Sequence, residues 1–173
     1  MDFAAVTQIG EASVGSGVDA AHVNTVLGRY GSPVETAWAT ALATPRVGYA
    51  PFVAVLKPNV PVKPLTLFVT KADIRGDDHG TLVWGAAQAG VAGGVADAVA
   101  AQAIPHREVD ALLLIVAVWV SWDATDADAV YANNREATRT ALRRGVAGEP
   151  TLSEVLDAAG SPENPYFLPS VDP

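Results

Sequence analysis

The sequence predicts an α+β fold, a two-layer α/β sandwich in which helices cover a mixed sheet. The opening segments read as consecutive strands, so simple alternation of strands and helices does not describe the chain. A ten-residue apolar run, Ala111–Val120, also lies between two long helical patterns. The length of 173 residues predicts one domain. We expect its core over 6–150, with a C-terminal helix and an extended tail over 151–173.

The first two segments predict a β-hairpin. Val6–Gly15 and Ala20–Gly28 read as strands, and Ser16–Gly17 is the turn between them.

The next segment predicts a helix that begins at Ser32 and ends near Pro45. Ser32 is suited to the N-cap and Pro33 to the first helical position. Glu35 stands where it completes a capping box.

The middle of the chain predicts two short strands and a long helix. Phe52–Leu56 and Leu65–Thr70 are apolar, and Pro58-Asn59 begins the turn between them. A helix capped by Asp77 or Asp78 is expected to run to about Ala103, where Pro105 stops it. Its many glycines cost about 1 kcal/mol each relative to alanine, which indicates close packing against a sheet or another subunit.

The last third predicts a central strand followed by two helices. Ala111–Val120 is apolar without alternation, so we expect a strand buried on both faces. Asp126–Val146 has helical periodicity, and Thr151–Glu154 is a capping box that opens a short helix. The Pro-rich end, 161–173, is expected to be extended.

Composition excludes several classes of function. The net charge of −8 and the scattered basic residues argue against nucleic acid as a partner. The absence of cysteine excludes disulfides, thiolate metal sites and cysteine nucleophiles. The N-terminus does not resemble a secretory signal. The longest apolar run is half of the roughly 20 residues that a membrane helix needs. We therefore expect a cytoplasmic protein with no membrane association.

The three histidines are the first candidates for chemistry. His22 lies on a predicted strand and titrates near neutrality, so it is either a proton donor or a half-buried strand histidine. His79 and His106 are expected at helix ends, solvated or capping. No two histidines have the spacing of metal ligands, so no zinc or iron site is expected.

Other polar and aromatic candidates lie at element ends. Lys71 ends a strand and suits either a ligand contact or the surface, and Asp73 would share its face if the strand continued. Gln88 is isolated among small residues, where it either binds a ligand or fills a buried polar gap. Trp119 and Trp122 are expected to pack a core or a subunit interface.

Six blocks of sequence together resemble the formaldehyde-activating enzymes. They are GEAxVGxG at 10–17, AH at 21–22, GSPxETA at 31–37, AVxxPNxPxKPxTL at 54–67, GxAQxxVAxxVxDAV at 85–99 and NxEATxxxxxRxVxGEP at 134–150. The resemblance implies a fold like the second domain of ribosomal protein S5. It also implies a homopentameric ring with the ligand in a cleft between subunits, and a histidine catalyst without metal or organic cofactor.

The resemblance also assigns site residues. His22 falls on the catalytic histidine, and the substrate-binding positions are Asn24, Val53, Lys71, Asp73 and Gln88. His22, Lys71 and Gln88 keep the family's usual identity. Departures from the family pattern occur at Ser16, Asn24, Val53, Asp73, Ser121, Asn133 and Arg135. Because the family has aspartate at Asn24 and threonine at Asp73, Asp73 is a candidate to replace the lost carboxylate as an acceptor for the pterin's polar edge.

The implied reaction is condensation of formaldehyde with tetrahydromethanopterin, or a related reduced pterin, to the methylene-pterin. It would serve one-carbon metabolism and formaldehyde detoxification. His22 would act as the general acid, with tetrahydromethanopterin as co-substrate. The altered site residues keep a second interpretation open, in which the same ring-shaped scaffold is a carrier or sensor that binds a different small molecule.

Overall fold

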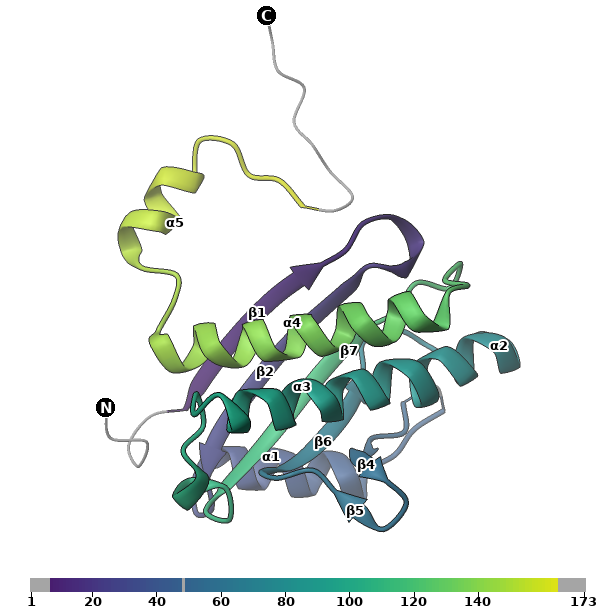
Figure 1. Ribbon diagram of the computed structural model, residues 1–173, viewed down its shortest axis with the longest axis horizontal. Helices are drawn as coiled ribbons and strands as arrows, with labels where there is room; N and C mark the ends of the chain where they lie inside the picture. The colour runs from purple at the N-terminus through teal and green to yellow at the C-terminus, as the bar shows by residue number, and fades with distance from the viewer. Residues whose placement is uncertain (1–6, 48, 165–173) are drawn as a thin grey trace, which may run out of the picture.

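The computed structural model describes residues 7–47 and 49–164, and its centre is a five-stranded sheet (Figure 1). The strand order is β1-β2-β7-β6-β3. The strands are β1 (Gln8–Val14), β2 (Ala21–Arg29), β3 (Phe52–Val53), β6 (Leu65–Thr70) and β7 (Leu112–Trp119). A separate hairpin joins β4 (Val55–Lys57) to β5 (Val60–Pro61).

The sheet is mixed, as predicted. β1, β2 and β7 are antiparallel neighbours, β6 runs parallel to β7, and β3 is antiparallel to β6. Parallel neighbours need a long crossover, which here consists of α2 (Gly76–Thr81), η2 (Leu82–Ala87) and α3 (Gln88–Ala100). The α+β class predicted from the sequence is therefore confirmed.

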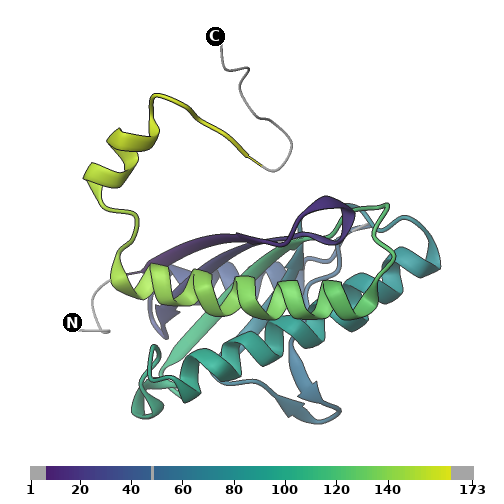
Figure 2. The ribbon, with the colours of Figure 1, turned by 45° about the horizontal axis from the view of Figure 1, so that its top comes forward.

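Helices cover the two faces of the sheet unequally. α3 and α4 (Ala127–Ala147) lie side by side across one face in both ribbon views (Figures 1 and 2). The shorter α1 (Pro33–Ala43) lies behind the opposite face, against β2 and β7. Gly28 of β2 permits this approach, because a Cβ there would lie 2.5 Å from Val34. None of the described helices covers the rest of this second face, and we call it the open face.

The burial of side chains along the central strand β7 reflects this unequal cover. Leu112, Leu113 and Leu114 are buried, as predicted for a strand enclosed on both faces. From Ile115 onward the burial alternates, with Ala117 and Trp119 only half-buried. The prediction of full burial is therefore wrong for the second half of the strand, because α1 is too short to cover it.

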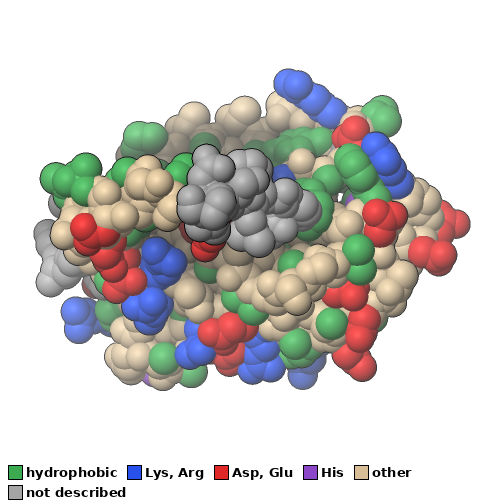
Figure 3. Space-filling view, turned by 90° about the horizontal axis from the view of Figure 1, so that it is seen from above, with side chains coloured by type: hydrophobic (Ala, Val, Ile, Leu, Met, Phe, Trp, Pro, Cys, Tyr) green, Lys and Arg blue, Asp and Glu red, His purple; other side chains and the backbone are tan. Residues whose placement is uncertain are grey.

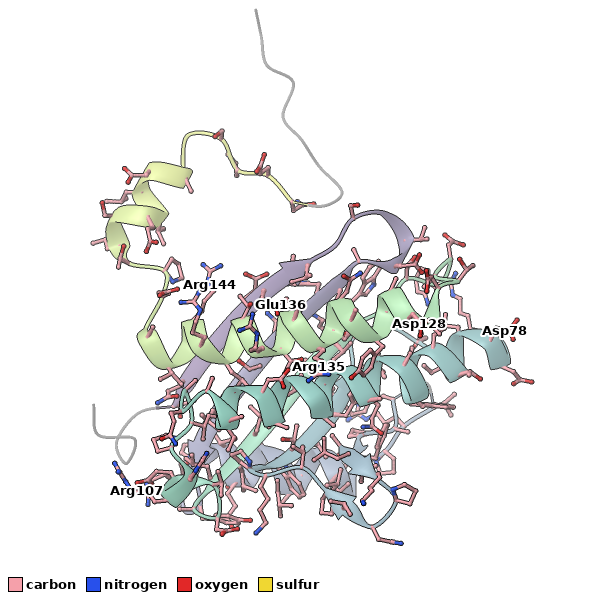
Figure 4. All side chains as sticks on the ribbon, in the orientation of Figure 1. Asp78, Arg107, Asp128, Arg135, Glu136 and Arg144 are labelled. Carbon is pink, nitrogen blue, oxygen red and sulfur yellow. The ribbon has the colours of Figure 1, made fainter. Side chains whose placement is uncertain are left out.

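The helical layer is held by close backbone approach between α3 and α4. A Cβ on Gly90 would lie 2.4 Å from the Tyr131 carbonyl oxygen, and one on Gly94 would lie 2.4 Å from that of Arg135. Gly90 and Gly94 are closely packed, as expected, but against the neighbouring helix of the same protomer and not against a sheet or another subunit. Arg135 strengthens the contact through a two-bond ion pair with Asp97, at 2.7 and 2.8 Å (Figure 4).

Three expected element boundaries differ from those observed. The long helix begins at Gly76 with Arg75 at the N-cap, so neither Asp77 nor Asp78 caps it, and it ends at Ala100. It also contains a π-helical turn, η2, which sequence periodicity does not show. The expected strand Phe52–Leu56 is split between β3 and β4, because the chain leaves the sheet at Ala54.

The capping predictions are confirmed at Ser32 and at Thr151–Glu154. Ser32 caps α1 by accepting from the Val34 N–H, although Glu35 accepts from the Gly31 N–H and so does not close a true capping box. Asp126 caps α4. Thr151 and Glu154 form the predicted box at the start of α5 (Leu152–Ala158).

The segment after α4 stands away from the body in both ribbon views. Every residue from 151 to 164 is exposed, including Leu152 and Leu156 of α5. Residue 6 of the first predicted strand and residues 165–173 of the predicted extended tail lie outside the described residues.

Within residues 7–47 and 49–164, one helix is long and apolar enough to cross a membrane by length and composition alone. It is Gly76–Ala100, and 56% of its most apolar window is buried inside the fold. Its apolar side chains, including Val91 and Val95, belong to the hydrophobic core between the helices and the sheet.

The glycine contacts give a stability prediction. Gly90→Ala should lower the free energy of unfolding by about 1–3 kcal/mol, because a Cβ would overlap the Tyr131 carbonyl. Gly85→Ala is the matched control, since a Cβ there meets nothing within 4 Å and should stabilise by up to about 1 kcal/mol. Chemical denaturation of both variants measures the difference. Equal effects would show that the α3–α4 approach is not sterically limited.

Candidate active site

Three predicted site residues meet on the open face. The Nζ of Lys71 lies 3.2 Å from Nδ1 of His22, and it donates to Oδ1 of Asn24 at 2.8 Å. Lys71 follows β6, while His22 and Asn24 lie on β2. The structure thus joins residues almost fifty positions apart in the sequence.

Strand register places these side chains together. His22 pairs with Trp119 on β7, and Thr70 pairs with Val118 on the other side of β7. The ladder continues one step, because the Lys71 N–H donates to the Val118 carbonyl at 2.8 Å. Since side chains alternate along a strand, His22 and Asn24 point to the same face. Their odd-numbered neighbours, such as Val23, are buried towards the helices.

A fourth residue, Glu11, completes the group and was not predicted from the sequence. Its Oε1 lies 3.1 Å from Nε2 of His22, and its β1 position pairs with Asn24. The predicted hairpin, combined with the two-residue alternation of strands, contained the signal that would have found it. The four residues Glu11, His22, Lys71 and Asn24 form a continuous polar chain, which we call the His22 relay.

The His22 relay borders a cavity of about 870 Å³. The cavity lies between the strands and the segment that follows α5, and all four relay residues line it. The other described lining residues are Ser13, Ala20, Ala21, Trp119, Arg144, Glu163 and Asn164. A space of this size accommodates a ligand as large as a drug or cofactor.

Burial and neighbouring charges shift two pKa values in the His22 relay. Burial lowers the pKa of His22 below its ordinary value, the Lys71 ammonium lowers it further, and the Glu11 carboxylate opposes both effects. Burial also lowers the pKa of Lys71 to about 8, against an opposing effect of Glu11. Near pH 7, therefore, the imidazole is mostly neutral and the amine is within reach of deprotonation.

These protonation states fix the direction of the hydrogen bonds. An ionised carboxylate only accepts, so Glu11 holds the ring hydrogen of neutral His22 on Nε2. Nδ1 is then the acceptor for the Lys71 ammonium. A single proton shift from Lys71 to Nδ1 would produce a neutral amine beside an imidazolium paired with Glu11. The group can therefore both store and deliver a proton.

The remaining predicted binding residues lie apart from this cavity within the protomer. Val53 is on the edge strand β3, and buried Gln88 donates to the Val55 carbonyl from α3. Asp73 lies in the loop after β6, which ends at Thr70, so the condition for sharing a face with Lys71 is not met. The backbone carbonyl of Asp73 accepts a hydrogen bond from the Trp122 indole N–H at 2.9 Å.

Most departures from the family pattern have structural contacts of their own. Asn133 donates to the Asp19 carbonyl and so ties α4 to the hairpin turn. Arg135 pairs with Asp97 between the two helices. Ser121 accepts from the Asp123 N–H, and Ser16 precedes the short helix η1, Gly17–Asp19. Among the departures at described residues, Asn24 is the one that belongs to the His22 relay, because its Oδ1 accepts from Lys71.

The remaining histidines and the tryptophans have other surroundings. His79 is buried, so the expectation of a solvated histidine is wrong. Its Nδ1 accepts from the N–H of Arg75, the N-cap residue of α2, so the capping alternative is confirmed, and its Nε2 contacts the Val120 carbonyl. His106 is exposed and contacts the Val99 carbonyl. Trp122 is covered by the Arg75 guanidinium, 3.4 Å from the ring centroid. Over 7–47 and 49–164, no three metal-binding side chains form a candidate metal site.

Charge is unevenly distributed over the surface. Seen from above, acidic side chains gather at the end of the molecule on the right of Figure 3. Asp78 at the start of α2 and Asp128 at the start of α4 lie at that end (Figure 4). Carboxylates at helix N-termini are favourably placed in the helix dipole, so this clustering has a structural cause.

Comparison with known proteins agrees with the resemblance seen in the sequence. Residues 9–167 match the family described as formaldehyde-activating enzyme. A relative from Methanosarcina barkeri, named 5,6,7,8-tetrahydromethanopterin hydro-lyase, is 42% identical over 160 residues, which cover 92% of this chain and 90% of that protein.

Longer proteins contain a similar unit. The bifunctional enzyme Fae/Hps of Methanosarcina acetivorans is 37% identical over 150 residues, or 87% of this chain and 38% of that protein. The enzyme of the same name from Methanococcoides burtonii is 38% identical over 148 residues, or 86% of this chain and 37% of that protein.

The electrostatics of the His22 relay predict opposite shifts for two substitutions. Glu11→Gln should lower the pKa of His22, because the carboxylate that raises it is lost. Lys71→Met should raise the same pKa by removing the nearby positive charge. Titration of the imidazole by NMR measures both shifts, with exposed His106 as the internal control. Shifts in the same direction would contradict the proposed contacts.

Proposed function

The chain belongs to the formaldehyde-activating enzyme family, and from this membership we propose that it condenses formaldehyde with tetrahydromethanopterin, or a related reduced pterin, to the methylene-pterin. The single observation that supports this proposal most directly is the His22 relay, which borders a cavity large enough for a pterin. We further propose that the reaction takes place in the cytoplasm.

The proposed chemistry needs a proton at one defined moment. A pterin nitrogen adds to formaldehyde, and the resulting carbinolamine loses its hydroxyl as water when an acid supplies a proton. His22 is the proposed acid, and Lys71 can supply its proton across the 3.2 Å contact at Nδ1. The second pterin nitrogen then closes on the iminium carbon and releases a proton.

Orientation is the other proposed contribution of the protein. Glu11 holds Nε2, so the imidazole ring is fixed with Nδ1 directed at Lys71. Asn24 holds Lys71 from the other side at 2.8 Å. A donor fixed in this way needs no reorganisation during the reaction, and the cavity would hold both pterin nitrogens in ring-closing geometry.

We propose that the complete site is shared between subunits of a homopentamer. Val53, Asp73 and Gln88 do not line the His22 cavity of their own protomer. A neighbouring subunit could bring them to it. Large apolar side chains are available for such an interface, since Ile9 on the open face is 66% exposed and Trp84 of the helical layer is 47% exposed.

A second candidate is a binding protein without catalysis, a carrier or sensor on the same scaffold. It is favoured by Asn24, where the family has aspartate, because this departure directly contacts Lys71 of the His22 relay. Acceleration of the pterin reaction distinguishes the two functions, since a carrier would bind a ligand without raising its rate of condensation.

His22→Ala tests the proposed reaction. We expect the protein-dependent rate of methylene-pterin formation to fall about 10²–10⁴-fold, because the positioned acid is lost. The rate is followed by the absorbance change of the pterin, with the spontaneous condensation subtracted. His106→Ala is the matched control and should retain the wild-type rate. If the wild-type protein gives no acceleration over the spontaneous reaction with any reduced pterin, the proposed condensation fails.

The shared-site proposal predicts a defined oligomer. Light scattering at micromolar concentration should give the mass of five chains. Ile9→Lys should shift the population towards smaller species, because it places a charge on the uncovered part of the sheet. A stable wild-type monomer would rule out a cleft shared between subunits.

A further inference from the structure

Lys71 has the surroundings of an activated nucleophile. Its amine touches a potential base, Nδ1 of His22, and that base is oriented in turn by Glu11 through Nε2. A nucleophile beside a base that a third group orients is the arrangement found in enzymes with covalent intermediates. The amine also lies on the wall of the cavity, so a small carbonyl compound can reach it.

We propose that Lys71 captures formaldehyde covalently, first as a carbinolamine and then as an iminium, and passes the carbon to the pterin from that state. This inference rests on the proposed function, because it takes formaldehyde as the substrate. It adds a nucleophilic role for Lys71, which the proposed condensation used only as a source of protons for His22.

Capture begins with one proton transfer. Lys71 gives a proton to Nδ1 of His22, which leaves a neutral amine beside an imidazolium paired with Glu11. The amine attacks the formaldehyde carbon, and the new hydroxymethyl oxygen takes the proton that the nitrogen releases. The carbon–oxygen bond then breaks, the hydroxyl leaves as water with the imidazolium proton, and the nitrogen lone pair forms the carbon–nitrogen double bond.

Transfer returns Lys71 to its starting state. A pterin amine attacks the iminium carbon, and its proton passes to Lys71. The bond from Lys71 to the carbon breaks, with the electron pair going to Lys71, and the carbon becomes an iminium on the pterin. The second pterin nitrogen closes the ring, and the proton that it releases passes to the neutral Lys71 amine, which restores the ammonium and balances the proton used in the loss of water.

Covalent capture by Lys71 explains why an asparagine stands at position 24 in place of the family's aspartate. A carboxylate 2.8 Å from Nζ would hold Lys71 as a paired ammonium, which cannot attack a carbonyl carbon. The neutral amide accepts the same hydrogen bond without that stabilisation. Burial meanwhile lowers the pKa of Lys71 to about 8, so about a tenth of the amine is neutral at pH 7. The titratable and charged groups that line the same cavity are His22 on β2, Glu11 on β1, Arg144 on α4 and Glu163 after α5.

The test is reductive trapping on the intact protein. The chain has three lysines, Lys57, Lys63 and Lys71, so the other two are internal controls. Limiting formaldehyde with cyanoborohydride at pH 7 converts an iminium to a methylamine, which peptide mass spectrometry locates. We expect Lys71 to carry at least about ten times more methyl than Lys57 or Lys63, because more of its amine is neutral. Equal labelling of the three lysines would overturn the inference.

Two variants separate covalent capture from a purely electrostatic role. Lys71→Arg keeps the positive charge and the donors but cannot form the iminium, so the pterin-dependent rate should fall at least about tenfold. An unchanged rate in this variant would overturn the inference. Asn24→Asp should lower trapping at Lys71 at pH 7 and restore it at higher pH, and faster trapping at pH 7 would contradict it. Circular dichroism confirms that both variants are folded.

The proposed function and this inference can fail separately. Pterin-dependent activity without preferential trapping at Lys71 would remove the covalent step and leave the condensation reaction. Preferential trapping without pterin-dependent activity would support capture by Lys71 and remove the proposed pterin reaction.

Discussion

The hydrogen-bond ladders on the two sides of β7 determine where the site forms. One ladder fixes His22 opposite Trp119, and the other carries Lys71 to the Val118 carbonyl just beyond the end of β6. β2 and β6 are therefore held two strand spacings apart, roughly 10 Å, which a lysine side chain can span. A shift of β2 or β6 by one residue against β7 would turn the site side chains of that strand to the helical face. The strand register therefore determines the geometry of the site.

The helical layer of α3 and α4, on the face of the sheet opposite the site, holds the strands in this register. Gly90 and Gly94 let α3 approach the backbone of α4, and Asp97 with Arg135 ties the two helices together. Gly10 of β1 comes even closer to α4, where a Cβ would lie 1.9 Å from the Ala141 carbonyl oxygen. Close packing transmits strain instead of absorbing it. The strand that carries Glu11 is thus fixed to the layer on the opposite side of the sheet.

The sequence predicted what depends on local chemistry. Hairpins, caps and helical periods are set by neighbouring residues, and most of those elements are found. The open half of β7 was missed because its burial depends on the length of α1, a distant helix. The contact between His22 and Lys71 could not be derived from local pattern, since β7 lies between their strands. The resemblance identified both residues as functional but gave no contact between them, and it did not indicate Glu11.

The single lysine among the described residues of the His22 cavity has a consequence for the durability of the protein. Formaldehyde fixes proteins by bridging amines and thiols to nearby nucleophiles. This chain has no cysteine, and of its three lysines Lys63 is paired with Asp110 on the surface. Few side chains are therefore available to be cross-linked. A member of this family with such a composition should therefore tolerate formaldehyde concentrations that would cross-link an ordinary lysine-rich protein.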